Sequence, residues 1–196
     1  MSITDFINAR ASETYPEPRS GGHDEIIRKV CPIVAETLPP AAQILDVGCG
    51  QGPALAWFTE HGFCPRGIAT NQDDLDACRS LDLLAADIDM HDLSSIANGC
   101  YDCVFARHVL EHSVAPFYVL AEFARILKPG GVLYVDVRSP DTPCEHELNR
   151  NHYSVLGWKM WASLMQRAGF TNERMMEIKA KTPVGEDVYF SFIATK

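Results

Sequence analysis

The sequence predicts an α/β fold: a Rossmann-like, doubly wound mixed sheet of about seven strands, with helices on both faces and an antiparallel last strand. Short apolar segments alternate with longer segments whose apolar residues follow helical spacing, which is typical of parallel strands connected by helices. The last two strand-like segments are joined only by the short turn 182–185. Because a parallel return needs a crossover of about a dozen residues, this final pair must be antiparallel.

The predicted elements follow in order along the chain. Apolar residues at helical spacing predict a first helix at 26–38, which Pro39 and Pro40 end. Short apolar runs that stop at glycines or polar residues predict strands at 43–47, 65–69, 83–87, 101–106 and 132–137. Amphipathic segments predict helices at 53–61, 73–79 and 115–127. The sequence then predicts a Lys-Pro-Gly-Gly turn at 128–131, a helix at 155–168, and strands at 172–179 and 187–195.

The composition fits one soluble globular domain. Of 196 residues, 46% are hydrophobic and 22% are charged, which is ordinary for a folded chain. We expect a single domain at 23–196 and a polar N-terminal arm or cover at 1–22. Seventeen Lys and Arg against 26 Asp and Glu give a net charge of −9, so no nucleic-acid partner is expected. No apolar run approaches the ~18–20 residues that cross a bilayer, so no membrane partner is expected either.

The seven cysteines are odd in number and scattered, which fits a reducing compartment and predicts a cytoplasmic protein. Cys100 and Cys103 form a lone C-x-x-C pair. A structural zinc site would need a second such pair, and a redox pair would open a helix. Because Cys103 falls in the predicted strand 101–106, we interpret the pair as small structural residues.

A glycine-rich loop follows the first predicted strand. It has the sequence Asp46-Val47-Gly48-Cys49-Gly50-Gln51-Gly52, with glycine at every second position from Gly48. Such glycines allow a sharp turn and let a ligand touch bare backbone. The helix start behind them offers unpaired N–H groups, and ligands of these sheets bind at the carboxyl ends of the strands. The loop therefore predicts a ligand site, although a tight turn without a ligand would share this pattern.

Three motifs in order resemble class I methyltransferases that use S-adenosylmethionine. The first is D-x-G-x-G-x-G at 46–52, and the second combines Tyr101-Asp102-Cys103-Val104 with His108-Val109-Leu110-Glu111-His112. The third is the turn Arg125-Ile126-Leu127-Lys128-Pro129-Gly130-Gly131 before the fifth strand. The resemblance implies an enzyme with S-adenosylmethionine as cofactor. It implies transfer of a methyl group to O or N of a small-molecule acceptor by in-line displacement.

The resemblance also implies cofactor-binding residues. The methionine part of the cofactor would lie against Asp46, Gly48, Cys49 and Gly50, with Ala106 and Arg107 lining the same side. The adenine would lie near Asp89 and Met90, with Asp87 as a rival for the acidic position. The family usually ends its second strand with an acid that binds the ribose, and here that position is Ala69. We expect a polar substitute, Asn71 before Thr70 or Gln72; weak cofactor affinity is the alternative.

Histidines concentrate after the fourth and fifth strands. We predict His108 as the general base, with His152 next, because imidazole titrates near neutral pH. The long connection 138–153 suggests an acceptor site with His146, Arg150 and Tyr153, to which we add His112.

Two other functions stay open. His108-x-x-Glu111-His112 matches the inverzincin metalloprotease pattern, which would make the chain a metal-dependent hydrolase. The two histidines would then bind zinc, Glu111 would serve as the base, and His146 and His152 could supply further ligands. The absence of the ribose-binding acid at Ala69 would also fit a methyltransferase-like binding domain that has lost catalysis. In the favoured interpretation no residue is assigned to a metal.

Overall fold

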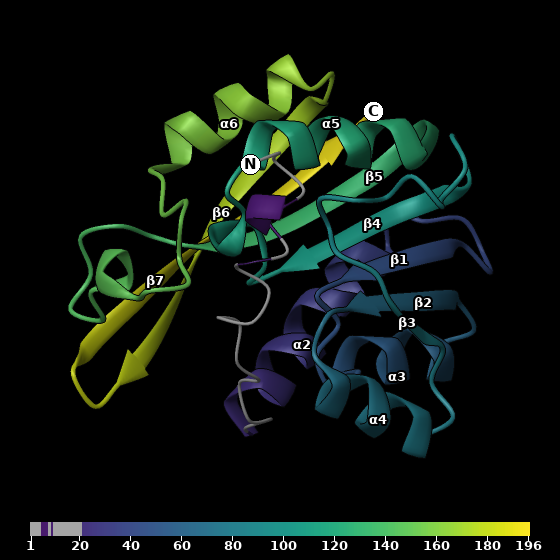
Figure 1. Ribbon diagram of the computed structural model, residues 1–196, viewed down its shortest axis with the longest axis horizontal. Coiled ribbons are helices and arrows are strands. Elements are labelled where there is room, and N and C mark those ends of the chain that lie inside the picture. The colour runs from purple at the N-terminus through teal and green to yellow at the C-terminus, as the bar shows by residue number, and fades with distance from the viewer. Residues whose placement is uncertain (1–4, 8, 10–20) are drawn as a thin grey trace.

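The computed structural model describes residues 5–7, 9 and 21–196, and Figure 1 shows one sheet with helices on both of its faces. Within these residues the sheet has seven strands in the order β3-β2-β1-β4-β5-β7-β6. The order of the strands reverses between β1 and β4, which makes this the switch point where ligands of such sheets bind. The predicted fold class is confirmed.

Five parallel strands form most of the sheet. They are β1 (Gln43–Val47), β2 (Cys64–Ala69), β3 (Ala85–Asp87), β4 (Tyr101–Arg107) and β5 (Leu127–Arg138). The last strand, β7 (Gly185–Thr195), is antiparallel to both β5 and β6 (Thr171–Thr182), as the short turn between the last two strands predicts.

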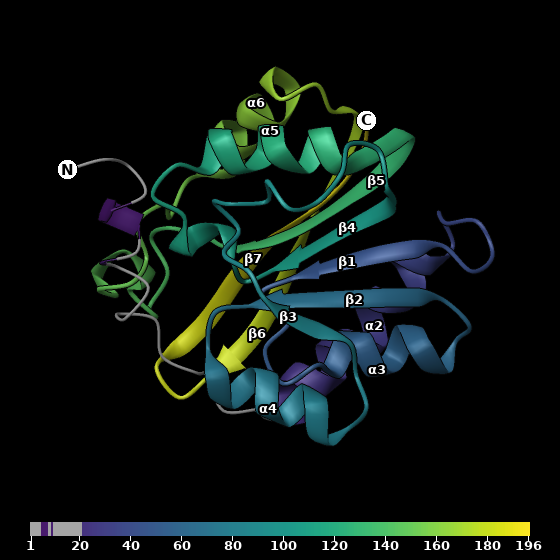
Figure 2. The same cartoon turned by 45° about the vertical axis from the view of Figure 1, so that its right-hand side comes forward.

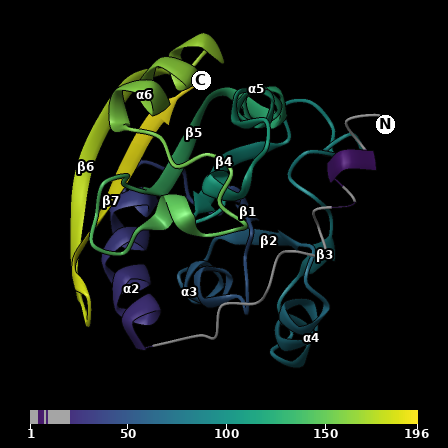
Figure 3. The same cartoon turned by 60° about the vertical axis from the view of Figure 1, so that its left-hand side comes forward.

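The helices divide between the two faces, as Figures 2 and 3 show. The α2 (Gly21–Ala35) and α3 (Pro53–Glu60) helices pack on one face, and α5 (Pro116–Ile126) and α6 (Trp158–Arg167) on the other. The α4 helix (Gln72–Ser80) lies beside α3, near the β3 edge. Two short 3-10 helices, η1 (Leu110–His112) and η2 (His146–Leu148), belong to the connections after β4 and β5.

The alternation of side chains along β4 explains why both faces can be buried. Cys103 and Phe105 face the α2 and α3 side, whereas Val104 and Ala106 face the α5 and α6 side. Phe105 stacks on Tyr134 at a centroid distance of 4.7 Å. Cys103 is fully buried in the strand, in agreement with its predicted structural role.

Two predicted features differ most from the structure, whereas the other elements differ only by a few residues at their ends. The predicted turn 128–131 is the irregular start of β5, because Gly130 N–H donates to the Lys196 carbonyl and Lys196 N–H donates to the Gly131 carbonyl. These bonds to the C-terminal residue extend strand pairing where the local sequence indicates a turn. The first helix spans Gly21–Ala35 instead of 26–38, and it accommodates Pro32 internally.

Most of the predicted arm 1–22 lies outside the described residues, so its role as a cover stays a prediction. Ile7, which is described, lies against the cavity discussed below. The described helices include none with the length and hydropathy of a bilayer-spanning segment.

Candidate functional site

The glycine loop joins the carboxyl end of β1 to α3. Gly48 and Gly50 have φ angles of 67° and 51°, in the left-handed region that favours glycine. A Cβ at Gly48 would lie 2.8 Å from Val109 Cγ2, whereas a Cβ at Gly50 would meet nothing within 4 Å. Gly48 therefore allows the loop to pack against the segment after β4, and Gly50 leaves bare backbone beside open space.

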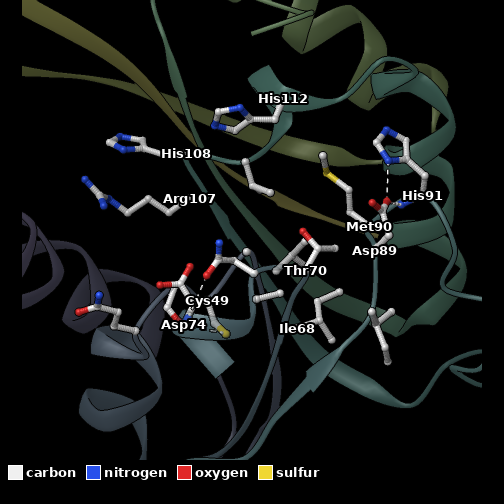
Figure 4. A pocket seen from close by; sticks show the side chains of 18 of the residues that line it. Cys49, Ile68, Thr70, Asp74, Asp89, Met90, His91, Arg107, His108 and His112 are labelled. Atoms are coloured by element: carbon white, nitrogen blue, oxygen red, sulfur yellow. Dashed lines mark hydrogen bonds and ion pairs between the residues drawn. The ribbon is translucent and has the colours of Figure 1, made fainter. Parts of the chain in front are cut away.

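A cavity of about 240 Å³ opens beside this loop. Its wall combines the loop, the ends of β2 and β3, and the segment after β4, and Figure 4 shows Cys49 and Asp74 across the cavity from His112. The predicted site residues in this wall are Gly48, Cys49, Gly50, Asn71, Asp89, Met90, Arg107, His108, His112 and Tyr153. Residues that lie 105 positions apart in sequence, from Gly48 to Tyr153, therefore share one site.

Five predicted site residues do not line the cavity: Asp46, Ala106, His146, Arg150 and His152. Asp46 and Ala106 are buried within the sheet, so their side chains do not reach the cavity. Burial raises the pKa of Asp46 well above its usual range, and the nearby Cys78 adds to this effect. Arg150 is exposed on the connection after β5.

The first turn of α4, the helix that follows β2, carries a carboxylate that the sequence did not single out. The Asn71 side chain caps α4 by accepting hydrogen bonds from the backbone N–H groups of Asp73 and Asp74, so its oxygen is already used. Asp74 lies in the first turn of α4, is 8% exposed and lines the cavity. Within the described part of the chain its Oδ1 atom has no hydrogen-bond partner. Burial raises the pKa of Asp74, and the neighbouring Asp73 raises it further.

Asp89 is held in place by His91, another residue that the sequence did not single out. Asp89 Oδ1 accepts a hydrogen bond from the His91 backbone N–H, and His91 Nδ1 lies 2.7 Å from the same oxygen. His91 Nε2 lies 2.9 Å from the Ser113 hydroxyl, which ties the β3 end to the segment after η1. Burial alone would raise the pKa of Asp89, but these bonds outweigh it and lower the pKa.

A buried ion pair supports the end of β4. Arg107 Nε lies 3.2 Å from Asp136 Oδ2, and the Asp136 side chain is 1% exposed. Ser191 donates a hydrogen bond of 2.8 Å to Asp136 Oδ1. Burial raises the pKa of Asp136, and the charge of Arg107 opposes this shift. His108 Nε2 lies 3.4 Å from the same carboxylate, so the carboxylate faces both cavity residues.

His108 has an uncommon backbone conformation. Its φ of 52° lies in the left-handed region, which costs free energy for a residue with a Cβ and is frequent at functional sites. Its ring stacks on Tyr189 at a centroid distance of 4.8 Å. The stacking, together with Asp136 behind it, fixes the orientation of the imidazole at the cavity wall.

The connection after β5 lies against η1, where the backbone N–H groups of Tyr153 and Ser154 donate to the Glu111 carbonyl, and it brings three histidines together. The rings of His112 and His152 are 4.8 Å apart, and those of His146 and His152 are 5.7 Å apart. Glu111 is fully buried, with its Oε1 atom 3.6 Å from Arg138 Nε. Burial and the nearby His112 lower the pKa of His152 to about 4. His152 therefore stays neutral near pH 7.

His146 pairs with Asp187 in β7 at 2.8 Å. Burial would raise the pKa of Asp187, but the His146 and Tyr189 hydrogen bonds and the Arg138 charge lower it from 3.8 to about 2. A carboxyl with a lowered folded-state pKa stabilises the fold above its unfolded pKa, and this contribution disappears as the pH falls through the folded pKa.

We therefore expect the free energy of unfolding to fall between about pH 4 and about pH 2. Asp187→Asn should show a smaller fall in the same range, because the amide cannot titrate. Urea denaturation at several pH values measures both proteins. Parallel pH curves for the two would contradict the assignment.

The chain resembles known methyltransferases in sequence. A family model described as a methyltransferase domain matches residues 23–175. The chain belongs to the S-adenosylmethionine-dependent methyltransferase family. S-adenosylmethionine is the cofactor of this family, which fits a glycine loop with bare backbone at the cavity wall.

Curated relatives include an arsenite methyltransferase of Aquipseudomonas alcaligenes, 29% identical over 75% of this chain and 49% of that protein. A ubiquinone biosynthesis O-methyltransferase of Vibrio parahaemolyticus is 28% identical over 58% of this chain and 47% of that protein. The chain thus spans about half the length of these two methyltransferases.

Solved structures share the fold at low identity. A methyltransferase from Archaeoglobus fulgidus has a TM-score of 0.76 and 17% identity, covering 88% of this chain and 94% of that one. Phosphoethanolamine N-methyltransferase 2 of Haemonchus contortus, in complex with S-adenosyl-L-methionine, has a TM-score of 0.72 and 14% identity, covering 86% of this chain and 52% of that one. These likenesses concern the methyltransferase fold alone.

Proposed function

We propose that this methyltransferase binds S-adenosylmethionine in the cavity and transfers its methyl group to O or N of a small-molecule acceptor. The observation that carries the proposal is one cavity with the open glycine loop on one side and His108, His112 and Tyr153 on the other. The cofactor supplies a methyl group on a sulfonium, so the new bond forms as the carbon–sulfur bond breaks and sulfur keeps the electron pair.

The chain's own residues divide into a cofactor side and an acceptor side. Backbone at Gly48, Cys49 and Gly50 would hold the methionine end, and Asp89 with Met90 would hold the adenine. His112 and Tyr153 would contact the acceptor. His146 and Arg150 lie outside the cavity wall, so the acceptor role predicted for them receives no support from their positions.

His108 is the residue we assign as proton acceptor. A carboxylate behind an imidazole fixes its orientation and stabilises its protonated form, and Asp136 occupies that position at 3.4 Å from Nε2. His152 lies outside the cavity wall, and its pKa of about 4 makes it a weak base near pH 7. We therefore keep the role of base for His108 alone.

Asp74 is the residue we assign to the cofactor's ribose in place of the acid missing at Ala69. In nucleotide-binding sheets an acid about 20 residues after the glycine loop accepts hydrogen bonds from ribose hydroxyls. Asp74 follows that loop, lines the cavity and keeps one buried carboxylate oxygen without a partner among the described residues. A hydroxyl donor would satisfy this oxygen.

Asp74→Asn is expected to weaken S-adenosylhomocysteine binding by roughly 10- to 100-fold, since hydrogen bonds to charged groups contribute about 1.5–3 kcal/mol. Isothermal titration calorimetry measures the change. The matched control is Asp73→Asn, because Asp73 lies in the same helical turn but is exposed. The double variant Ala69→Asp/Asp74→Asn should recover affinity. Equal affinities for Asp74→Asn and Asp73→Asn would contradict the ribose assignment.

The proposed function itself is tested by two measurements on the unmodified chain. Calorimetric titration with S-adenosylmethionine should show one site per chain. Incubation with methyl-labelled cofactor and a panel of hydroxyl and amine acceptors should then transfer label to at least one of them. Absence of cofactor binding at saturating ligand would refute the proposal, and binding without transfer to any acceptor would favour a domain that has lost catalysis.

A further inference from the structure

Side chains that lie beside the cavity form a cluster with the donor set of a metal site. Glu111 and His112 come from η1, and His152 comes from the connection after β5. One possible ligand atom from each of the three lies within 4.8 Å of the other two. Two imidazoles and a carboxylate are a common ligand set for catalytic first-row divalent metals.

The two histidines have the tautomer that a metal would require. His112 Nδ1 lies 2.9 Å from the Asn151 carbonyl, and His152 Nδ1 lies 3.0 Å from the His146 carbonyl. A carbonyl can only accept, so each Nδ1 carries the proton and each Nε2 is the nitrogen with the lone pair. The Asn149 amide nitrogen lies 3.4 Å from His152 Nε2, and an ion would take the place of this long contact. Metal-bound histidines are usually fixed in this way, by donating the other ring N–H to a backbone carbonyl.

Glu111 supplies the carboxylate of this cluster. Glu111 is fully buried, and Arg138 lies between it and Asp187, at 3.6 Å and 3.3 Å respectively. A buried carboxylate is costly unless a cation lies close to it, and a divalent ion bound by Glu111 would be such a cation beside the Arg138 guanidinium.

A second cluster, made of Cys144, His146 and Asp187, is a weaker candidate. His146 Nε2 already lies 2.8 Å from Asp187 Oδ1, and that oxygen also accepts from the Val188 backbone N–H at 3.0 Å. The other carboxylate oxygen of Asp187 accepts from Arg138. Protein groups therefore occupy the atoms that an ion would need in this second cluster.

We propose that Glu111, His112 Nε2 and His152 Nε2 bind one divalent transition-metal ion at the acceptor side of the cavity. His112 connects the cluster to the cavity, because it belongs to the cluster and also lines the cavity. Figure 4 shows it opposite Cys49 and Asp74. The structure thus pairs Glu111 and His112 with His152, where the metalloprotease pattern pairs them with His108. Glu111 becomes a ligand, not a base.

The ion would bind an acceptor hydroxyl, and this role rests on the proposed function. A bound divalent metal lowers the pKa of a hydroxyl and holds it in place. The hydroxyl proton passes to His108, the base assigned above, the oxygen forms its bond to the methyl carbon, and the carbon–sulfur bond breaks with its electron pair remaining on sulfur. The proposal therefore favours an acceptor with a hydroxyl group over an amine.

The experiment uses Mn²⁺ as the probe, because the seven cysteines would compete for zinc. Untagged chain is dialysed against a chelator, and free Mn²⁺ is followed by electron paramagnetic resonance during titration. One ion should bind per chain, and His152→Gln should weaken binding by roughly 100-fold or more. Glu111→Gln provides a second variant, and S-adenosylhomocysteine titration shows whether each variant keeps its cofactor site.

Two histidine variants serve as controls. His61→Gln changes an exposed histidine after α3 and should leave Mn²⁺ binding unchanged. His146→Gln should also leave Mn²⁺ binding unchanged, because His146 belongs to the second cluster. Loss of Mn²⁺ binding in this variant alone would show that the ion binds in the second cluster, which would overturn the proposal. Cofactor binding without Mn²⁺ binding in the unmodified chain overturns the metal site and leaves the proposed function intact. Mn²⁺ binding without cofactor binding refutes the proposed function instead.

Discussion

Gly48→Ala is expected to reduce the affinity for S-adenosylhomocysteine by roughly 100-fold and to lower the free energy of unfolding by roughly 2–4 kcal/mol. Two costs add up at this position. The φ angle of 67° is unfavourable for a residue with a Cβ, and the new Cβ would lie 2.8 Å from Val109 Cγ2. Either the loop moves away from Val109 or the Val109 segment shifts, and both segments line the cavity.

Variants at two other glycines distinguish the effect of backbone strain on stability from the effect of a new Cβ on cofactor binding. Gly62, which follows α3, has a φ of 80°, and a Cβ at this position would meet nothing within 4 Å, so Gly62→Ala should lower stability without affecting cofactor binding. Gly50→Ala has the same backbone cost, but its Cβ stands at the cavity wall and should weaken binding. Calorimetry and urea denaturation measure all three variants. Unchanged affinity in both Gly48→Ala and Gly50→Ala would show that the cofactor does not lie against this loop.

Asp136→Ala is expected to lower the free energy of unfolding by roughly 3–5 kcal/mol, because it leaves a buried guanidinium without its partner. Asp136 is 1% exposed, pairs with Arg107 at 3.2 Å and accepts from Ser191 at 2.8 Å. The variant should also lose turnover, since His108 would lose the carboxylate behind it. Urea denaturation and initial rates measure the two effects separately.

A double variant and a surface variant control this prediction. Replacing both partners, as in Arg107→Met/Asp136→Leu, should recover much of the stability, because no unpaired charge then remains buried. Glu25 pairs with Lys29 on the exposed surface of α2, so Glu25→Ala should leave the unfolding midpoint unchanged. A midpoint for Asp136→Ala that equals that of Glu25→Ala would contradict the role given to the buried pair.

Much of the fold could be predicted because its signals are local. The β1 strand spans 43–47 as predicted, since a short apolar run that ends at glycines is typical of a buried parallel strand. The antiparallel C-terminal pair is also confirmed, because a short turn permits no parallel return. The predicted turn at 128–131 is wrong because its pairing partner, Lys196, lies at the far end of the chain.

The cofactor side of the cavity could be predicted better than the acceptor side. Gly48, Cys49 and Gly50 belong to one short motif, and a backbone turn depends on its own few residues. Asp74 carries no comparable signal, because an acid in the first turn of a helix is favoured by the helix dipole alone. Only the folded chain shows that this carboxylate is buried and faces the cavity.

The sequence by itself determined the alternation of strands with helices, the glycine loop and the family's motifs, because periodicity and turn chemistry are encoded over short stretches. Tertiary structure alone decided that His112 meets His152 instead of His108, that Asp136 lies behind His108, and that Asp74 faces the cavity. These contacts join residues from different strands and connections. Their geometry depends on how the elements pack and on where each side chain points, and the spacing of residues along the sequence determines neither.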